Sequence, residues 1–285
     1  MNKSLNVSRR AFLGTAAAVA APSGAAPERD VVINAHDHLH HRGFKDWREY
    51  DRRVIEAADK LGVDQICCSI LPPERPTTLE GFRLCNQWLL EAMRRFPGRI
   101  LGYVFVNPGY QREALEEVRR YVEDYGFIGV KLYNDYVVTE PVVAPLLELA
   151  GRMKIPILHH AAHASWLSPP QPRVSDAGNI AEAARRFPET TLICAHICGG
   201  GDWEWTAKTL RTAPTVYLDT SGSVIDEGTV EFAVRMLGAE RLLFACDMSW
   251  TAGAGRIRSA ELSPEDRRKI LGANMQRILS RRGRA

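Results

Sequence analysis

Residues 31–41 read V-V-I-N-A-H-D-H-L-H-H and join a β-branched apolar run to closely spaced histidines. The run at 31–33 favours a short buried strand. His36 and His38 follow it, and because side chains at i and i+2 leave the same face of an extended backbone, both imidazoles can reach one ion. Imidazole is a common ligand of zinc and similar divalent metals. The segment therefore predicts a strand that ends in two metal ligands, with a histidine-rich polar loop as the alternative.

Seven more apolar runs follow along the chain, and segments of helical periodicity separate them. The predicted strands lie at 63–71, 100–106, 127–133, 155–160, 191–196, 216–219 and 241–247, and the predicted helices at 47–61, 78–96, 111–125, 140–153, 177–187, 205–210, 230–237 and 264–279. Eight strands that alternate with helices predict an α/β fold, a (β/α)8 TIM barrel. A doubly wound open sheet is the alternative, but it normally carries a glycine-rich phosphate turn after its first strand, and residues 34–38 contain no glycine.

The eight histidines occupy only three places in the sequence, and each place follows a predicted strand. They stand at positions 36, 38, 40 and 41, at 159, 160 and 163, and at 196. Asp247 closes the eighth apolar run, where an acid is a poor core residue but a reasonable metal ligand or base. Because all strand C-termini of a barrel open on one face, these residues are expected to meet there. A helix N-cap is the alternative for a single aspartate.

The first 25 residues have the features of a cleavable export signal. Lys3, Arg9 and Arg10 precede an apolar run, and the S-G-A sequence at 23–25 offers small side chains for cleavage near Ala25. The sequence S-R-R-A-F-L at 8–13 resembles a twin-arginine signal, which implies the twin-arginine translocase as a partner and the periplasm as the destination. The apolar run is too short to serve as a stable membrane anchor. Residues 26–285 are then expected to form one TIM-barrel domain.

Composition limits the classes of partner and the redox chemistry. The whole chain carries a formal charge of +3, and its three basic residues before the first acid lie in the signal, so the domain itself is neutral. Neutrality gives no electrostatic case for binding nucleic acid or an anionic membrane. The basic end with Arg281, Arg282 and Arg284 is interpreted as a solvated helix terminus. The six cysteines match neither a zinc ribbon nor a disulfide scaffold and are interpreted as buried small hydrophobes, two of which, Cys198 and Cys246, lie near candidate site residues.

Six motifs stand in order along the domain. They are I-N-A-H-D-H at the first strand, G-V-K-L-Y at the fourth, P-I-L-H-H-A at the fifth, A-H-I-C-G-G at the sixth, F-A-C-D at the eighth and I-L-G-A-N-M-Q-R-I-L near the end. In this combination the chain resembles the amidohydrolase superfamily, in particular the amidohydrolase-2 group of metal-dependent TIM-barrel hydrolases and decarboxylases. It departs from the pattern at Asn34, where the family usually has aspartate, and at Met248-Ser249, where an aromatic residue and a proline are common.

The resemblance implies the identity of the metal ligands and of the catalytic groups. The four implied ligands of one divalent ion, expected to be Zn2+, are His36, His38, His160 and Asp247. His196 is implied as the catalytic histidine that polarises the substrate or handles a proton, and Asp247 shares the proton transfer. A second metal bridged by a carboxylated Lys131 is the weaker alternative, and without it Lys131 is expected to meet an anionic group of a small-molecule substrate.

Five tryptophans follow predicted strands and are candidates for the rim of an aromatic-lined pocket: Trp47, Trp166, Trp203, Trp205 and Trp250. Anchoring of loops and the interface of a homo-oligomer are the alternatives. The candidates for substrate binding are Lys131, Tyr133, Trp166, Arg173 and Trp250.

Three functions are compatible with these residues. The first prediction is a metal-dependent hydrolase that uses metal-activated water on a lactone, amide or ester carbonyl of a small, cyclic or aromatic substrate. The alternative is a non-oxidative decarboxylase of an unsaturated or aromatic carboxylic acid, for which Lys131 and Arg173 are the available carboxylate-binding cations. A non-catalytic periplasmic ligand-binding barrel is the alternative from another class of protein.

Overall fold

The computed structural model describes residues 30–39, 46–72, 74–163, 173–197, 201–224 and 226–282. The predicted signal, Trp166 and Cys198 lie outside these residues. None of the described helices has the length and hydropathy that a membrane-spanning helix needs.

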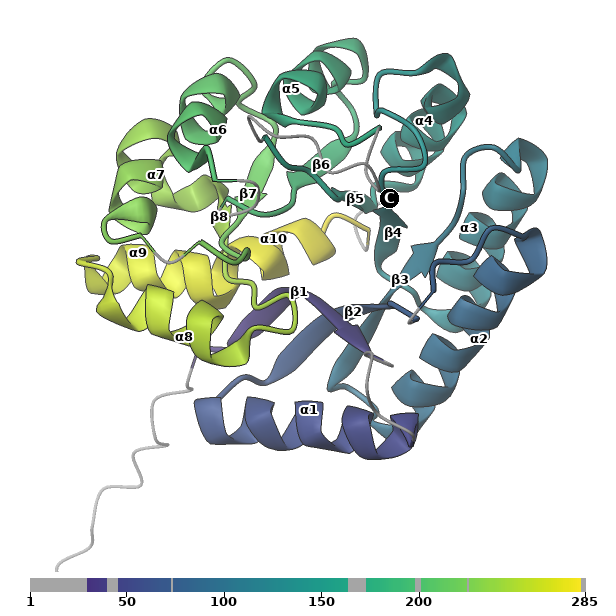
Figure 1. Cartoon of the computed structure of the whole chain (residues 1–285), viewed down its shortest axis with the longest axis horizontal. Coiled ribbons are helices and arrows are strands. Elements are labelled where there is room, and N and C mark those ends of the chain that lie inside the picture. Colours follow the sequence, from purple (N-terminus) through teal and green to yellow (C-terminus); the bar gives the residue numbers. More distant parts are fainter. Residues whose placement is uncertain are drawn as a thin grey trace, which may run out of the picture.

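Eight strands alternate with helices and form one parallel sheet in the order of the sequence (Figure 1). The strands are β1 (Ile33–Leu39), β2 (Gln65–Ile70), β3 (Ile100–Phe105), β4 (Gly129–Leu132), β5 (Pro156–His159), β6 (Thr191–Cys194), β7 (Tyr217–Asp219) and β8 (Leu242–Leu243). The α-helices are α1 (Trp47–Leu61), α2 (Leu79–Arg95), α3 (Gln111–Tyr125), α4 (Ala144–Met153), α5 (Ala177–Arg186), α6 (Trp203–Leu210), α7 (Thr229–Leu237), α8 (Trp250–Ser259), α9 (Pro264–Arg268) and α10 (Asn274–Leu279). Two short 3₁₀ turns, η1 (Pro141–Val143) and η2 (Ala239–Arg241), and a π-turn, η3 (Lys269–Ala273), complete the described elements.

The sheet curls into a nearly closed barrel, as the alternation of strands and helices predicts. Each strand pairs in parallel with the next from β1 to β8. Across the remaining seam, the Ala35 amide donates to the Phe244 carbonyl at 2.8 Å and the Asp247 amide donates to the His36 carbonyl at 2.9 Å. The strand C-termini therefore face one end of the barrel, which we call the mouth.

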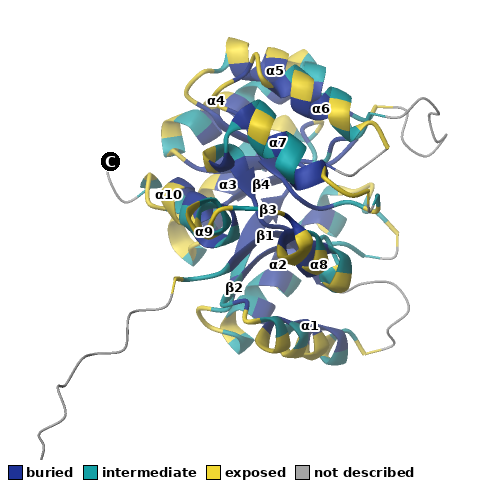
Figure 2. Cartoon of the chain, turned by 90° about the vertical axis from the view of Figure 1, so that its left-hand side faces the viewer, coloured by how far each residue is buried: buried dark blue, intermediate teal, exposed yellow. Residues whose placement is uncertain are grey.

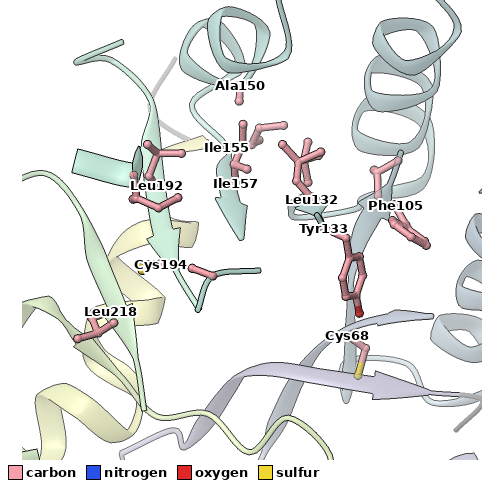
Figure 3. Packing of buried hydrophobic residues seen from close by; sticks show 14 of the residues in the cluster. Cys68, Phe105, Leu132, Tyr133, Ala150, Ile155, Ile157, Leu192, Cys194 and Leu218 are labelled. Atoms are coloured by element: carbon pink, nitrogen blue, oxygen red, sulfur yellow. The ribbon is translucent and has the colours of Figure 1, made fainter. Parts of the chain in front are cut away.

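Two separate apolar clusters account for the packing of the barrel. Lumen residues such as Leu158, Ile193 and Leu243 pack on Met275 and Ile278 of α10, which closes the N-terminal end of the barrel, the floor. The larger cluster lies between the strands and the surrounding helices, and Figure 3 shows part of it. Helix residues that face the strands are buried and outward ones are exposed (Figure 2), as amphipathic helices require.

β1 continues past the two histidines. The sequence predicts a strand that ends in them, whereas the ladder with β2 continues to Leu39, opposite Ile70. The pairing shifts register between Asn34 and Asp37. Because an extra residue at such a bulge changes the alternation, Ile33 and Ala35 of the lower lumen cluster and the two histidines above them can share the lumen side. His36 and His38 thus lie inside a paired strand rather than in a loop.

The C-terminal region also differs from the prediction. The segment at 264–279 is divided into α9, η3 and α10, and at η3 a side chain on Gly272 would collide with the Val31 carbonyl oxygen. Helix α8 was not predicted, since Gly253 and Gly255 lower its helical propensity. Gly253 is required where α8 approaches the chain after β8, because a Cβ there would lie 2.8 Å from the Ala245 carbonyl oxygen.

Candidate metal centre

Two imidazoles from β1 face one another in the lumen at the mouth. The Nε2 atoms of His36 and His38 are 3.3 Å apart, and both side chains are buried. Two nitrogens that each lie about 2.0–2.1 Å from one tetrahedral ion are roughly 3.3–3.4 Å apart. The pair therefore has the spacing of two ligands of a single metal ion.

The other ring nitrogen of each histidine has a fixed partner. His36 Nδ1 lies 2.8 Å from Oδ2 of Asp219, at the end of β7, and His38 Nδ1 lies 3.0 Å from the Ser69 hydroxyl of β2. A carboxylate only accepts hydrogen bonds, so His36 carries its proton on Nδ1 and leaves Nε2 available. This arrangement, in which outer partners orient the rings, is typical of metal-binding histidines.

Asp247 supplies a carboxylate beside the two nitrogens. Its Oδ1 lies 3.2 Å from His38 Nε2 and 3.7 Å from His36 Nε2. The backbone here adopts positive φ at two consecutive residues, 44° at Asp247 and 65° at Met248. Such conformations cost energy for residues other than glycine and persist where the surroundings fix them, often at functional sites.

His196 and His160 complete the histidines of the mouth. His196, also at positive φ (67°), places Nδ1 at 2.8 Å from the Ser221 hydroxyl and 3.5 Å from Oδ2 of Asp247. Its Nε2 lies 3.0 Å from His160 Nδ1. Among the described residues, donor atoms within 4.8 Å of one another form two groups of three: His36, His38 and Asp247, and His36, His196 and Asp219.

The first of these groups is the better metal site. Asp219 is already engaged by His36 Nδ1, by the His196 amide and by both the amide and the hydroxyl of Ser221. The two oxygens of Asp219 are therefore occupied by hydrogen bonds within the protein, which makes Asp219 a weaker candidate for a metal ligand. His160 belongs to neither group and lies beside His196 and the ring of Tyr133, 5.6 Å between centroids. Its role as a fourth ligand stays a prediction.

Two hydrogen-bond donors at the end of β4 face the two imidazoles, one donor to each ring. Lys131 Nζ lies 3.1 Å from His36 Nε2, and the Tyr133 hydroxyl lies 3.0 Å from His38 Nε2. In Figure 3 the Tyr133 ring extends from the end of β4 toward β2. The Arg75 guanidinium lies 4.5 Å from the centre of this ring and donates to the side-chain oxygen of Asn134. The two nitrogens that would face an ion thus also face a cation and a phenol.

Burial sets the charge state of these groups. The pKa of His36 falls to about 3 because burial disfavours the imidazolium, and the Lys131 ammonium adds to the effect. Burial also lowers the pKa of Lys131 to about 8. Burial alone would raise the pKa of Asp247, but the neighbouring histidines outweigh it and hold that pKa well below its usual range. At neutral pH His36 and His38 are therefore neutral imidazoles and Asp247 is a carboxylate, the forms that bind metal.

A family comparison agrees with this geometry. A family model described as amidohydrolase matches residues 33–281, which include every described side chain of the cluster. The chain belongs to the amidohydrolase-2 family. Metal dependence of this amidohydrolase is supported by the family and by the His–Asp cluster at the mouth. A search among curated proteins finds none with significant sequence similarity.

Solved structures of enzymes share the fold of this amidohydrolase at low sequence identity. A 2,6-dihydroxybenzoate decarboxylase from Rhizobium is 17% identical, with a TM-score of 0.67 over 88% of this chain and 98% of that one. A dihydroxybenzoic acid decarboxylase from Polaromonas, with bound manganese and an inhibitor, is 19% identical, with a TM-score of 0.68 over 90% and 98%. A 4-oxalomesaconate hydratase from Rhodopseudomonas palustris is 16% identical, with a TM-score of 0.66 over 88% and 96%.

The other predicted substrate-binding residues lie differently from Lys131 and Tyr133. Arg173 is exposed, donates to the Asp135 carbonyl at 3.3 Å and lies over the ring of Tyr136. Trp250 is half-buried, packs against the outer apolar cluster, and has a buried indole nitrogen without a hydrogen-bond partner among the described residues. Neither has a described contact with the metal cluster.

The remaining tryptophans of the predicted rim mostly contact helices. Trp47 lies 4.1 Å from the Arg48 guanidinium, and Trp203 packs on Phe232 of α7 and donates to Asp226. Trp205 stacks on His163, 3.8 Å between centroids. These contacts favour the interpretation that the tryptophans anchor helices and loops.

Sequence reasoning did not single out three residues of the site: Asp219, Ser69 and Arg75. Asp219 ends an apolar strand as Asp247 follows one, so the same signal could have found it. Ser69 is the only hydroxyl residue in the Q-I-C-C-S-I strand. Arg75 follows β2 in a polar, proline-containing segment, and nothing in its local pattern distinguishes it from a surface cation.

Proposed function

We propose that this protein is a metal-dependent non-oxidative decarboxylase of an unsaturated or aromatic carboxylic acid. One divalent ion would be held by His36, His38 and Asp247, with His160 as a further ligand. The titles of several enzymes that share its fold, including those from Rhizobium and Polaromonas, name this reaction class. At this low sequence identity the similarity to these enzymes supports only a shared fold. The proposal of decarboxylation therefore depends on the charged residues at the mouth of the barrel.

The observation that carries the proposal is the fully buried cation Lys131 beside the ligand nitrogens. Around the ligand nitrogens, Asp219 and Asp247 oppose Lys131 and Arg75, and the buried Asp37 carboxyl, whose pKa burial raises to about 7, adds at most one negative charge. A divalent ion therefore leaves an excess of at least one positive charge. Because buried charge is costly unless it is paired, the loaded site favours an anionic substrate. A carboxylic acid meets this requirement better than a neutral lactone or ester.

Each residue has a defined task in this reaction. When bound, the metal ion supplies a Lewis acid that fixes an oxygen of the substrate. Lys131 Nζ and the Tyr133 hydroxyl, which now lie beside the ligand nitrogens, would donate instead to the substrate carboxylate or a neighbouring oxygen once those nitrogens bind the ion. The carboxylate leaves as carbon dioxide, its bonding electron pair stays on the substrate carbon, and that carbon takes a proton. His196 and Asp247, 3.5 Å apart, are placed to hold and transfer that proton.

Hydrolysis is the second candidate function, and the same pair favours it. A carboxylate 3.5 Å from an imidazole can accept a proton from water that attacks a carbonyl. This route needs no buried cation, so it leaves Lys131 without a task. We therefore rank it below decarboxylation, which reverses the order that the sequence favoured.

Isotope labelling of turnover separates the two reactions. The purified protein is loaded with Mn2+ or Zn2+ and given aromatic and unsaturated acids, lactones and amides in heavy-oxygen water or in deuterium oxide. We expect release of carbon dioxide, one solvent deuterium on the product carbon and no solvent oxygen in a product carboxylate. Solvent oxygen in the product without carbon dioxide would replace decarboxylation by hydrolysis. Tight binding of a ligand without any turnover would support the non-catalytic alternative.

Lys131→Met tests the residue that carries the proposal. Loss of the only fully buried cation among the described residues should lower kcat/KM by about 100-fold or more while the metal content stays unchanged. A variant with unchanged kcat/KM for an acid substrate would show that Lys131 does not bind the carboxylate.

A further inference from the structure

The seam between β8 and β1 is closed in part by side chains. β8 has only two residues, so a regular strand ladder ends well below the mouth. Above it, three consecutive amides donate to β1: Cys246 to Asn34 Oδ1 at 3.0 Å, Asp247 to the His36 carbonyl at 2.9 Å and Met248 to Asp37 Oδ1 at 3.0 Å. The segment that carries Asp247 is thus attached to β1 at every residue.

The two side chains that accept these bonds also hold the histidine strand. The His36 amide donates to Asn34 Oδ1 at 3.2 Å, and the His38 amide donates to Asp37 Oδ1 at 2.8 Å. Asn34 Nδ2 donates to Asp37 Oδ2 at 2.7 Å, and both residues are fully buried. Each of the two acceptors therefore binds one amide of a candidate ligand and one amide next to Asp247.

We propose that Asn34 and Asp37 form a clasp that positions the two imidazoles relative to the Asp247 carboxylate and so determines the affinity for the metal ion. Asp247 and Met248 are at positive φ, a conformation that needs outside support. The clasp provides that support through the amides on both sides of Asp247. It rests on the proposed metal site but not on the reaction, and neither residue belongs to the donor group that would hold the ion.

The clasp works because one member is an amide and the other a carboxylate. The Asn34 amide offers an oxygen for two backbone donors and a nitrogen for Asp37, whereas Asp37 is purely an acceptor. Two carboxylates at this distance would repel each other or share a proton. Exchanging the two residues would preserve all five side-chain hydrogen bonds, since an aspartate at position 34 could accept two amides and an asparagine at position 37 could donate across the pair. This symmetry gives a sharp test.

The test compares Asn34→Asp with the exchanged double variant Asn34→Asp/Asp37→Asn. The affinity of each metal-free protein for Mn2+ and for Zn2+ is measured by competition with a chelating dye, at a temperature where both are folded by circular dichroism. Asn34→Asp should weaken binding about tenfold to 100-fold, as loss of outer partners of metal ligands does. The double variant should return to within about threefold of the natural protein, because the two changes compensate one another.

The sign of the effect separates positioning from simple electrostatics. Asn34→Asp adds a carboxyl group near a cation, so charge alone would tighten metal binding, or leave it unchanged where the two carboxyl groups share a proton, and would in neither case weaken it. The exchanged variant keeps the natural net charge. Asp37→Asn supplies a second variant if Asn34→Asp does not fold, and it should weaken binding by severalfold because the two amide nitrogens then oppose each other.

Asn274→Asp is the matched control for general destabilisation. Asn274 is also a fully buried amide, and its Nδ2 donates to the Ala239 and Leu242 carbonyls at 2.8 Å at the floor end of β8. This variant should melt at a lower temperature and bind the ion with unchanged affinity. Equal affinity in Asn34→Asp and the natural protein, or no recovery in the exchanged variant, would overturn the clasp. Failure of the natural protein to bind either ion would overturn the metal centre and the clasp together, whereas metal binding without decarboxylation leaves the clasp intact.

Discussion

The floor and the mouth of the barrel are built from the same strands and have opposite chemistry. At the floor, the lumen holds Ile193, Leu243 and their apolar neighbours, which α10 covers with Met275 and Ile278. A few residues further along the strands, the lumen holds imidazoles, carboxylates and the Lys131 ammonium. A short step along a strand therefore changes the environment from a hydrophobic core to a buried polar site.

The two ends also differ in what they contribute to stability. Apolar burial at the floor stabilises the fold by about 25 cal/mol per Å2 of apolar surface. At the mouth, burial lowers the pKa of His36 and Lys131 away from their usual values, and three residues adopt positive φ. Such features cost stability and are retained where function needs them. The comparison implies that substitutions at the floor change stability and those at the mouth change activity.

The largest expected effect follows from removing the two ligand histidines. His36→Ala/His38→Ala should abolish tight binding of Mn2+ and Zn2+ and lower kcat/KM by roughly 1000-fold or more, because metal catalysis supplies several kcal/mol. The melting temperature of the metal-free protein should fall as well, because two buried rings leave a cavity and the buried Asp219 carboxylate loses its hydrogen bond from His36. Metal analysis, steady-state kinetics and calorimetry measure the three quantities. Equal metal content and activity in the variant would remove the basis of the metal centre.

A smaller effect, of opposite kind, is expected at the floor. Ile278→Ala leaves a cavity between α10 and the lumen cluster and should lower the free energy of unfolding by about 2–4 kcal/mol. Metal affinity and kcat/KM, measured below the melting transition, should stay unchanged. Ile278→Val is the conservative control and should lose about 0.5–1.5 kcal/mol. A large loss of metal affinity in Ile278→Ala would show that the two ends of the barrel are coupled.

Much of the architecture follows from patterns that are local in sequence. Apolar runs that alternate with helical periodicity gave eight strands and most of the helices, because burial between two layers demands those periods. Acids and histidines after apolar runs identified the mouth, since parallel strands end on one side. These signals brought His36, His38, His196 and Asp247 together without any knowledge of distances.

The remainder depends on contacts between distant segments. Asp219 serves the site through His36, from 183 residues away. The asparagine at position 34 suggested an altered outer partner, but only the structure shows that Asp37 accepts its amide. Arg75 reaches Tyr133 from a segment with no regular pattern. Helix α8 was not predicted because its glycines lower the helical propensity of the segment. Gly253 is needed there for close packing against residues 245–246, and that contact cannot be read from the local sequence.

The smallest expected effect concerns Arg281 and Arg282, whose interpretation as part of a solvated helix terminus needs correction; Arg284 lies outside the described residues. Arg282 Nη1 donates to the Phe127 carbonyl at 2.9 Å and its Nη2 donates to the Val122 carbonyl, while Arg281 Nη1 donates to the Thr191 hydroxyl at 2.8 Å. These bonds attach the end of α10 to the start of β4 and β6, so they support the floor from below.

Arg282→Ala should therefore lower the free energy of unfolding by about 1 kcal/mol, the net worth of such hydrogen bonds at a half-buried position. Arg282→Lys keeps the charge but cannot reach two carbonyls with one planar fork, so it should lose nearly as much. Urea denaturation measures both, and metal affinity should not change in either variant. Full stability of Arg282→Lys would mean that charge alone matters there, whereas equal stability of all three proteins would mean that α10 holds the floor by its apolar side chains only.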